Sequence, residues 1–451
     1  MYDLIIIGAG PAGYYAAEFA GKSGLSVSLI EKEYLGGVCL NQGCIPTKAL
    51  LYCSKLYYLA KNSQKFGIKA ENVEFDLQTA MIRKQKIVET LRKGIEFSLK
   101  KNKVNIINGI GKIIGKGKDI FKVKVNNEIL ETKNLFIATG SKPIIPNIEG
   151  INKPFVVTNK EILNINFIPS SLVIIGGGAI GLEFAVFFSE LGSHVSVVEM
   201  LSDIGGKLDK EISLILKKEL EKKGIEFFLN SKVVKIGENE VIIESDKNQN
   251  KISCNLVLVS IGRKPDFEGL GLENIGNVEI INGAIKTNSN LATNIMGLWA
   301  AGDVNGVSML AHTAYREARV CIENILGKDS FVNYNAIPSV IFTHPEVAYV
   351  GFTKENALKE GINAIEVKLP NTYNGRYIAE TDMERGITKA VIDSKDKKII
   401  GIHMIGGNCS EMIYGAASMI ENNMKAEDVS KIVFPHPTVS EIIKDTIMLY
   451  E

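Results

Sequence analysis

Two cysteines separated by four residues are the strongest candidates for chemistry in this chain. Cys39 and Cys44 lie in the segment Gly-Gly-Val-Cys-Leu-Asn-Gln-Gly-Cys-Ile-Pro-Thr-Lys, residues 36–48. In a regular helix the two side chains would point apart, whereas a disulfide needs its Cα atoms about 4.4–6.8 Å apart. The glycines in this segment therefore predict a distorted helix start or a glycine-shaped loop, and the pair indicates a redox disulfide.

Two other interpretations of the pair are a metal clip and two unrelated buried thiols. A structural zinc site needs about four ligands. The remaining cysteines are scattered without metal-ligand spacing: Cys53, Cys254, Cys321 and Cys409. We therefore expect no metal site, and we expect these residues to be small core side chains.

A histidine near the C-terminus could serve the cysteine pair as a base. His436 lies between Pro435 and Pro437, and Glu441 is expected to begin the helix that follows. A carboxylate beside the imidazole would set its tautomer and basicity. Thiol–disulfide exchange needs a thiolate, so a positioned base is expected. From the residues alone His436 is either this base or a structural histidine. We expect structural roles for the other histidines: His194, His312, His344 and His403.

An internal repeat with an offset of 168 residues supplies the elements that must position these side chains. An apolar strand at 4–7, a glycine motif, a helix of small residues and a second strand at 27–30 recur from 172 onward. Each copy holds three glycines and an acidic residue at the same spacing: Gly8, Gly10, Gly13 and Glu31, then Gly176, Gly178, Gly181 and Glu199.

This pattern is typical of dinucleotide binding. The first glycine allows a tight turn, the second lets a pyrophosphate approach the backbone, and the third lets the helix pack closely on the strand. The helix N-terminus attracts the phosphates, and the acidic residue can accept hydrogen bonds from ribose hydroxyls. The alternative is that the glycines are only turn residues. Because both copies keep one spacing, we expect the chain to bind two adenine dinucleotides.

The chemistry indicates which dinucleotides these are. A carboxylate at Glu199 repels a ribose 2′-phosphate, and residues 199–207 contain no arginine, which favours NAD over NADP. A flavin is the natural intermediary between a dithiol and a nicotinamide. The cysteines follow the first copy, so FAD is predicted there and NAD in the second copy. Two later strands end at Gly140 and Gly262, and each would complete one nucleotide-binding unit.

Composition argues against other classes of partner. Apolar residues make up 45%, charged residues 23% and the net charge is +1, so no nucleic acid or anionic membrane is expected. The most apolar stretch, 172–188, is interrupted by glycines and contains Glu183, which predicts a strand, a loop and a helix rather than a membrane span. We see no signal peptide and expect a cytoplasmic protein.

Over essentially its whole length the chain resembles the pyridine nucleotide–disulfide oxidoreductases, and among them the dihydrolipoamide dehydrogenases. Segment 36–48 and the loop from His436 to Glu441 carry the resemblance. It implies an α/β fold with two Rossmann-like dinucleotide-binding domains, for FAD and NAD, and an α+β C-terminal dimerisation domain. The expected boundaries are 1–145 for the first part of the FAD-binding domain, 146–265 for the NAD-binding domain, 266–334 for the second part of the FAD-binding or central domain, and 335–451 for the interface domain.

The resemblance also implies roles near the flavin. Cys39 would exchange with the substrate, and Cys44 would lie against the flavin. Lys48 and Glu183 would pair between the disulfide and the nicotinamide.

Further roles follow for the later segments. Asp303 would hydrogen-bond the FAD ribityl chain, with Ala311 close by. His436 and Glu441 would act across the interface of a homodimer, in the active site of the other subunit.

The activity that the resemblance implies is the NAD+-dependent oxidation of dihydrolipoamide. The partner would be a lipoyl-bearing protein of a 2-oxo-acid dehydrogenase complex or of the glycine cleavage system, on a separate chain because no lipoyl domain precedes Met1. Gln42 and Cys409 depart mildly from the family pattern. The alternatives are a related disulfide reductase, such as one resembling glutathione reductase, and a non-catalytic nucleotide-binding scaffold.

Overall fold

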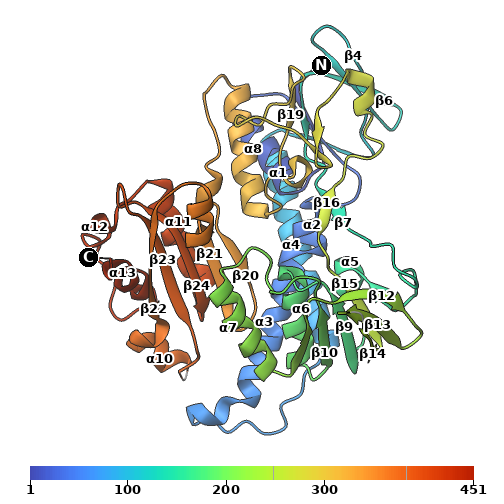
Figure 1. The fold of residues 1–451 in the computed structure, drawn as a ribbon. Coiled ribbons are helices and arrows are strands. Elements are labelled where there is room, and N and C mark those ends of the chain that lie inside the picture. The colour runs from blue at the N-terminus through green and yellow to red at the C-terminus, as the bar shows by residue number, and fades with distance from the viewer. Residues whose placement is uncertain (247, 382, 451) are drawn as a thin grey trace.

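The computed structural model describes residues 1–246, 248–381 and 383–450, and its α/β architecture is the one predicted. Lys247, in the predicted NAD-binding domain, and Asp382 and Glu451, in the predicted C-terminal domain, lie outside the described residues. Figure 1 shows an N-terminal group of strands and helices, a second group below it, and a C-terminal group beside both.

The first copy of the repeat forms a sheet in which β3, β2, β1 and β6 are parallel neighbours. Leu4 and Ile6 of β1 pack into the core on one face, while Ile5 and Ile7 pack on the other. A parallel strand buried on both faces reads as a continuous apolar run, as 4–7 does. The strands are β1 (Tyr2–Ile7), β2 (Val27–Glu31), β3 (Asn105–Asn108), β4 (Lys112–Lys116), β5 (Phe121–Val125), β6 (Glu128–Ile137) and β19 (Leu298–Ala300), which returns late in the chain to pair with β6.

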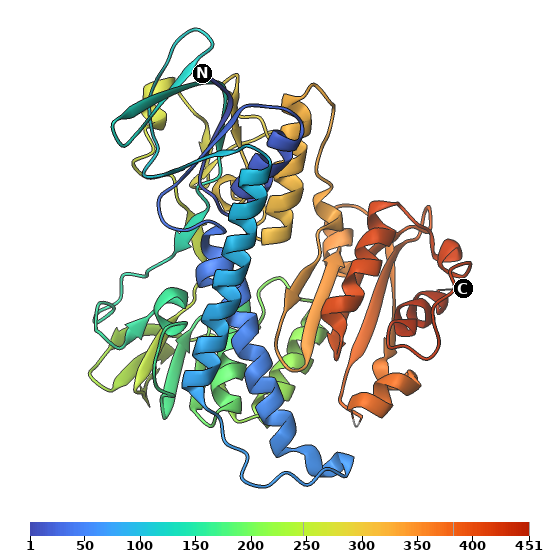
Figure 2. The same ribbon diagram turned by 180° about the vertical axis from the view of Figure 1, so that it is seen from behind.

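The helices that belong with this sheet carry the cysteines and flank the glycine motif. They are α1 (Pro11–Lys22), α2 (Gly37–Gln42), α3 (Cys44–Lys61), α4 (Leu77–Lys101) and α8 (Ala311–Ile325). Figure 2 shows α4 running alongside α3, from the N-terminal group of elements down to the second group. Helix α3 thus passes directly from one nucleotide unit to the other.

The second copy forms a parallel sheet in the order β11-β10-β9-β15-β8. Its strands are β8 (Val156–Val157), β9 (Ser171–Ile175), β10 (His194–Val198), β11 (Ile225–Phe228) and β15 (Leu256–Val259), and its helices are α5 (Asn159–Ile162), α6 (Ala179–Glu190) and α7 (Lys210–Lys222). An antiparallel sheet, β12 (Lys232–Ile236), β13 (Glu240–Ser245) and β14 (Asn248–Ser253), adjoins it. The predicted strand, loop and helix at 172–188 are confirmed.

The C-terminal group is built on an antiparallel sheet in the order β20-β21-β24-β23-β22. Its strands are β20 (Ser339–Ile341), β21 (Glu346–Gly351), β22 (Ala364–Pro370), β23 (Ile387–Asp393) and β24 (Ile399–Gly406), and its helices are α9 (Lys354–Lys359), α10 (Gly375–Thr381), α11 (Cys409–Glu421), α12 (Ala426–Val429) and α13 (Glu441–Met448). The predicted α+β organisation of the C-terminal segment is confirmed.

Short elements complete the described chain. Small ladders join β7 (Ser141–Pro143) to β16 (Arg263–Pro265) and β17 (Ile280–Ile281) to β18 (Ala284–Ile285). The 3-10 turns are η1 (Ser63–Phe66), η2 (Leu272–Ile275), η3 (Asp303–Asn305), η4 (Tyr334–Ala336) and η5 (Asn371–Tyr373). Within the ranges that the structure describes, none of the helices combines the length and apolar content that a membrane-spanning helix needs.

Candidate active site

The predicted cysteine pair is a disulfide at a break between two helices. Cys39 lies in α2, Cys44 is the first residue of α3, and their Cα atoms are 4.7 Å apart. Gly43 interrupts the helix with φ −151° and ψ −112°, and Gly36 begins α2 from a left-handed φ of +93°. The predicted distorted helix start is therefore confirmed, because glycine supplies the backbone that a continuous helix would not allow.

A residue between the cysteines fixes the short helix α2. The Asn41 side-chain amide donates to the carbonyls of Leu35 (3.0 Å) and Gly37 (2.8 Å). Its oxygen accepts from Arg92 Nε (3.1 Å) and Nη2 (2.7 Å), and the Arg92 guanidinium stacks over Tyr34 at 4.3 Å. Reasoning from the sequence missed Arg92, because the sequence around it does not indicate that its partner, Asn41, lies 51 residues away.

The first glycine loop has the geometry of a phosphate site. Gly8 has φ +100°, and a Cβ on Gly13 would collide with the Gly8 carbonyl oxygen, so the helix approaches the strand end closely. At Gly10 a Cβ would meet nothing nearer than the Gly37 Cα at 3.9 Å. Helix α1 begins there without a side-chain cap. Free N–H groups and open space at the second glycine fit a pyrophosphate.

The second glycine loop repeats this geometry. Gly176 has φ +106°, a Cβ on Gly181 would collide with the Gly176 carbonyl oxygen, and Gly178 has no neighbour within 4 Å of an added Cβ. Helix α6 also lacks a side-chain cap. The two loops differ in their surroundings: Gly37 packs so closely on the first that a Cβ there would lie 2.5 Å from the Gly10 Cα. The disulfide helix α2 is thus built against the first loop.

The two acidic residues are held in the same way. Glu31 accepts hydrogen bonds from Ala9 N (2.6 Å) and Glu33 N (2.8 Å). At the offset of 168, Glu199 accepts from Gly177 N (2.7 Å) and Leu201 N (2.9 Å). Each carboxylate is therefore anchored on its glycine loop at the end of the second strand, where a ribose is expected.

An ion pair connects α3 to the second unit. Lys48 Nζ lies 2.7 Å from Glu183 Oε2, so the predicted pairing is confirmed. Glu183 is buried, and its other oxygen accepts from Phe342 N at 3.1 Å. The Lys48 ammonium also lies 4.5 Å from the centre of the Phe342 ring. One carboxylate of α6 thus joins α3 to the C-terminal domain beside β20.

Gly140 and Gly262 lie at opposite ends of a short antiparallel ladder at the junction between the two units. Each precedes one strand of the β7–β16 ladder, and the Gly140 and Gly262 carbonyls accept from Asp266 N and Ile144 N, both at 3.0 Å. The glycines therefore mark the passage from one unit to the other.

Asp303 lies beside this junction and hydrogen-bonds Ser141. Arg263 donates to the Ser141 hydroxyl (2.8 Å) and carbonyl (2.6 Å). Burial lowers the pKa of Arg263, and the Asp303 carboxylate partly opposes this. Ala311, further along the chain, is the first residue of α8. Ser141 and Arg263 were missed by reasoning from the sequence.

His436 and Glu441 form the predicted pair. His436 Nδ1 lies 3.0 and 3.2 Å from the two Glu441 oxygens, and Thr438 N donates to the same carboxylate at 2.9 Å. The Thr438 N–H and the imidazole lower the pKa of Glu441, so it stays ionised and can hold the proton on Nδ1. The imidazole is 82% exposed.

Within one chain the structure does not bring His436 to the disulfide. Both views place α13, which begins at Glu441, on the outer side of the C-terminal group, well away from α2 (Figures 1 and 2).

The remaining cysteines and histidines lie outside this arrangement. Burial raises the pKa of Cys254 to about 11 and also raises those of Cys321 and Cys409, while Cys53 is half-buried. The histidines other than His436 contact the following acceptors: His194 Glu226, His312 the Pro338 carbonyl, His344 Glu190, and His403 the Phe352 carbonyl. No group of three or more potential metal ligands occurs within the described part of the chain.

Comparison of the sequence with known proteins identifies the family. The pyridine nucleotide-disulphide oxidoreductase family matches residues 2–318, and the dimerisation domain of the same family matches residues 337–447. The dihydrolipoyl dehydrogenase of Geobacillus stearothermophilus is 39% identical, over 98% of this chain and 94% of its own length. Dihydrolipoyl dehydrogenase 2, mitochondrial, of Arabidopsis thaliana is 38% identical, over 99% and 90%.

A solved structure agrees over the whole chain. The HOCl-induced flavoprotein disulfide reductase RclA of Escherichia coli has a TM-score of 0.86 at 29% identity, covering 100% of both chains. This chain therefore belongs to the pyridine nucleotide-disulphide oxidoreductase family.

Proposed function

We propose that the chain is a dihydrolipoyl dehydrogenase that oxidises protein-bound dihydrolipoamide and reduces NAD+ through its Cys39–Cys44 disulfide and FAD. One observation carries the proposal: the disulfide is built between two dinucleotide loops. Gly37 packs its helix onto the first loop, and Lys48 joins the following helix to Glu183 in the second unit. The full-length similarity to dihydrolipoyl dehydrogenases supports the substrate.

The thiol chemistry needs one base and two sulfurs from the protein, and the substrate brings two thiols. His436 Nε2 takes a proton from a substrate thiol, while Glu441 accepts a hydrogen bond from the other ring nitrogen, Nδ1. The substrate thiolate attacks Cys39 Sγ, the Cys39–Cys44 bond breaks, and Cys44 leaves as a thiolate. The second substrate thiol then attacks the substrate sulfur of the mixed disulfide, and its proton passes to the departing Cys39 Sγ. This closes the substrate disulfide, releases Cys39, and leaves two electrons on the cysteine pair.

We assign FAD to the first glycine loop and NAD to the second. Bound FAD supplies the two-electron chemistry that connects a dithiol to hydride transfer to NAD+. The residues proposed to hold FAD are Gly8, Gly10, Gly13, Glu31, Lys48, Gly140, Asp303 and Ala311. Those proposed to hold NAD are Gly176, Gly178, Gly181, Glu183, Glu199 and Gly262. The open space at the second glycine of each loop and the uncapped helices fit both dinucleotides.

The same proposal includes a homodimer in which His436 and Glu441 serve the disulfide of the other subunit. The exposed imidazole and the match to a dimerisation domain support it. We propose the domain boundaries 1–145, 146–265, 266–334 and 335–451, supported by the β7–β16 ladder at the junction and by the return of β19 to the first sheet. A separate lipoyl-bearing protein as partner, no nucleic acid or membrane, and a cytoplasmic location complete the proposal.

Steady-state turnover of the FAD-loaded protein tests the function. Dihydrolipoamide with NAD+ should react rapidly, and glutathione disulfide with NADPH should not. If turnover occurred only with NADPH and another disulfide, the proposed substrate and the interpretation of Glu199 as favouring NAD would both be wrong. No turnover with any thiol or disulfide, in a protein that retains FAD, would favour a scaffold.

A further inference from the structure

A buried carboxylate next to the proposed flavin site has no part in the mechanism above. Glu317, on α8, is fully buried. Its Oε2 accepts from Gly302 N at 2.6 Å, and its Oε1 accepts from the Tyr334 hydroxyl at 2.7 Å. Burial raises its pKa to about 6, against the effect of these hydrogen bonds. A buried acid is costly unless it is hydrogen-bonded, so its partners define what it does.

Its first partner lies in the loop that presents Asp303. Gly302 follows β19 with φ +77°, and Asp303 begins the turn η3 directly after it. Glu317 therefore accepts a hydrogen bond from the residue immediately before Asp303. The loop is also bounded by β19, which pairs with β6 of the first sheet.

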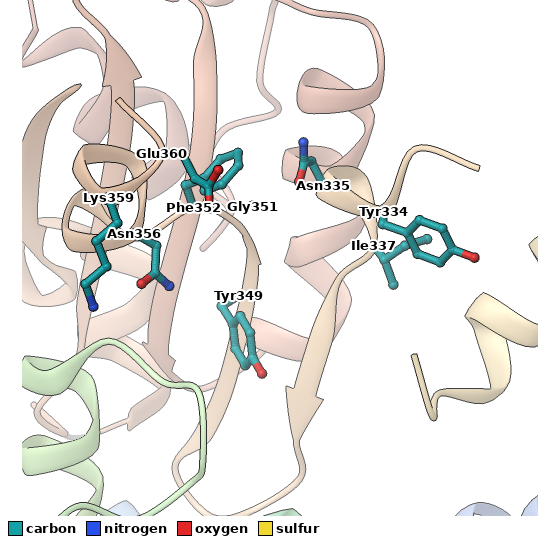
Figure 3. Close-up of a pocket in the computed structure, with 9 residues that line it drawn as sticks. All are labelled: Tyr334, Asn335, Ile337, Tyr349, Gly351, Phe352, Asn356, Lys359 and Glu360. Carbon is teal, nitrogen blue, oxygen red and sulfur yellow. The ribbon is translucent and has the colours of Figure 1, made fainter. Parts of the chain in front are cut away.

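Its second partner, Tyr334, lies in the turn η4, next to the boundary with the C-terminal domain. Tyr334 lies at the edge of a surface pocket that includes Asn335, Tyr349 and Phe352. Figure 3 shows the Tyr334 ring turned away from these side chains, and its hydroxyl donates to Glu317. With both oxygens occupied, the carboxylate has a fixed orientation toward Gly302.

We propose that Glu317 is a positioning residue for the flavin: it holds the 302–303 backbone so that the Asp303 carboxylate faces the ribityl chain. This rests on the proposed role of Asp303 in FAD binding. Removing the carboxylate leaves the buried Gly302 N–H without this acceptor and frees the loop. A carboxamide keeps an acceptor oxygen and should keep most of the effect.

The test compares Glu317→Ala and Glu317→Gln with Cys321→Ala. Cys321 is also fully buried, four residues further along α8, and has no part in the proposed site. FAD affinity is measured by reconstituting each apoprotein and following flavin fluorescence and the visible spectrum, with the melting temperature recorded in parallel. We expect Glu317→Ala to weaken FAD binding about 10-fold or more. Glu317→Gln should recover most of this loss, and Cys321→Ala should lower the melting temperature without changing FAD affinity.

Two results would overturn the proposal. One is FAD affinity in Glu317→Ala within about twofold of Cys321→Ala. The other is a Glu317→Gln protein that binds FAD as weakly as Glu317→Ala. The proposed function fails differently, since it is rejected by unaltered protein that binds FAD but does not oxidise dihydrolipoamide.

Discussion

The two glycine loops at 8–13 and 176–181 share their backbone turn, their close helix packing and their anchored acid, yet they differ in what is built on them. The first is covered by Gly37 and the disulfide helix α2, whereas an added Cβ at Gly178 would meet nothing within 4 Å. The two dinucleotide-binding units therefore differ in one respect: only the first has a redox disulfide built against its glycine loop. The difference predicts a retained cofactor at the first loop and an exchanging one at the second.

The largest effect is expected from a substitution that removes the disulfide, which is the feature that distinguishes the first copy. Cys44→Ser should lower NAD+ reduction by dihydrolipoamide about 10³-fold or more, because the thiol pair acts as a unit. Cys53→Ser, a change on the same helix α3, is the control and should retain activity. Unchanged dithiol turnover in Cys44→Ser would remove the disulfide from the mechanism and revive the scaffold alternative.

A matched pair of substitutions tests whether the loops hold different dinucleotides. Gly10→Ala should weaken FAD binding about 10-fold, and Gly178→Ala should raise the KM for NAD+ about 10-fold, because each Cβ occupies pyrophosphate space. Both added groups fit the protein without serious collision, so melting temperatures should change little. Flavin reconstitution and initial rates measure the two effects. If both variants affected the same cofactor, the assignment of the loops would be wrong.

A smaller effect is expected from substitutions of the two acidic residues, Glu31 and Glu199. Glu199→Gln should raise the KM for NAD+ several-fold, which corresponds to about 1 kcal/mol of binding free energy. It should also reduce the preference for NAD+ over NADP+, because the negative charge that repels a 2′-phosphate is gone. Glu31→Gln, its counterpart at the first loop, should alter FAD affinity alone. Initial rates with both nicotinamide cofactors measure the preference, and an unchanged ratio would show that Glu199 does not set it.

The last comparison concerns Glu317 and the pH dependence of stability rather than activity. Its pKa is raised from 4.5 to about 6, so the folded protein binds this proton more tightly than the unfolded chain. The stability that the neutral form contributes is therefore present below pH 4.5 and is lost as the pH rises to about 6, by about 2 kcal/mol. Glu317→Gln does not titrate, so its melting temperature in saturating FAD should rise relative to the unaltered protein across this window. A constant difference would mean that the carboxyl does not titrate there.

How much the sequence predicted depended on how local each signal was. The two glycine motifs, their acids and the pair His436–Glu441 are short-range patterns, and the distorted start at Cys39–Cys44 followed from helix geometry and nearby glycines. The Arg92–Asn41 contact and the burial of Glu317 arise from elements far apart in the chain. Glu317 lies in a polar stretch, Tyr-Arg-Glu-Ala-Arg, and is buried because the β19 loop returns over it.

The exposed position of His436 has a consequence for heredity. In the proposed dimer each active site takes Cys44 from one chain and His436 from the other. Two defective alleles, one coding for Cys44→Ser and one for His436→Gln, would each be inactive alone. Expressed together, they would form mixed dimers in about half of random pairings, each with one intact site, so about a quarter of all sites would work. Two loss-of-function mutations in one gene would then complement each other.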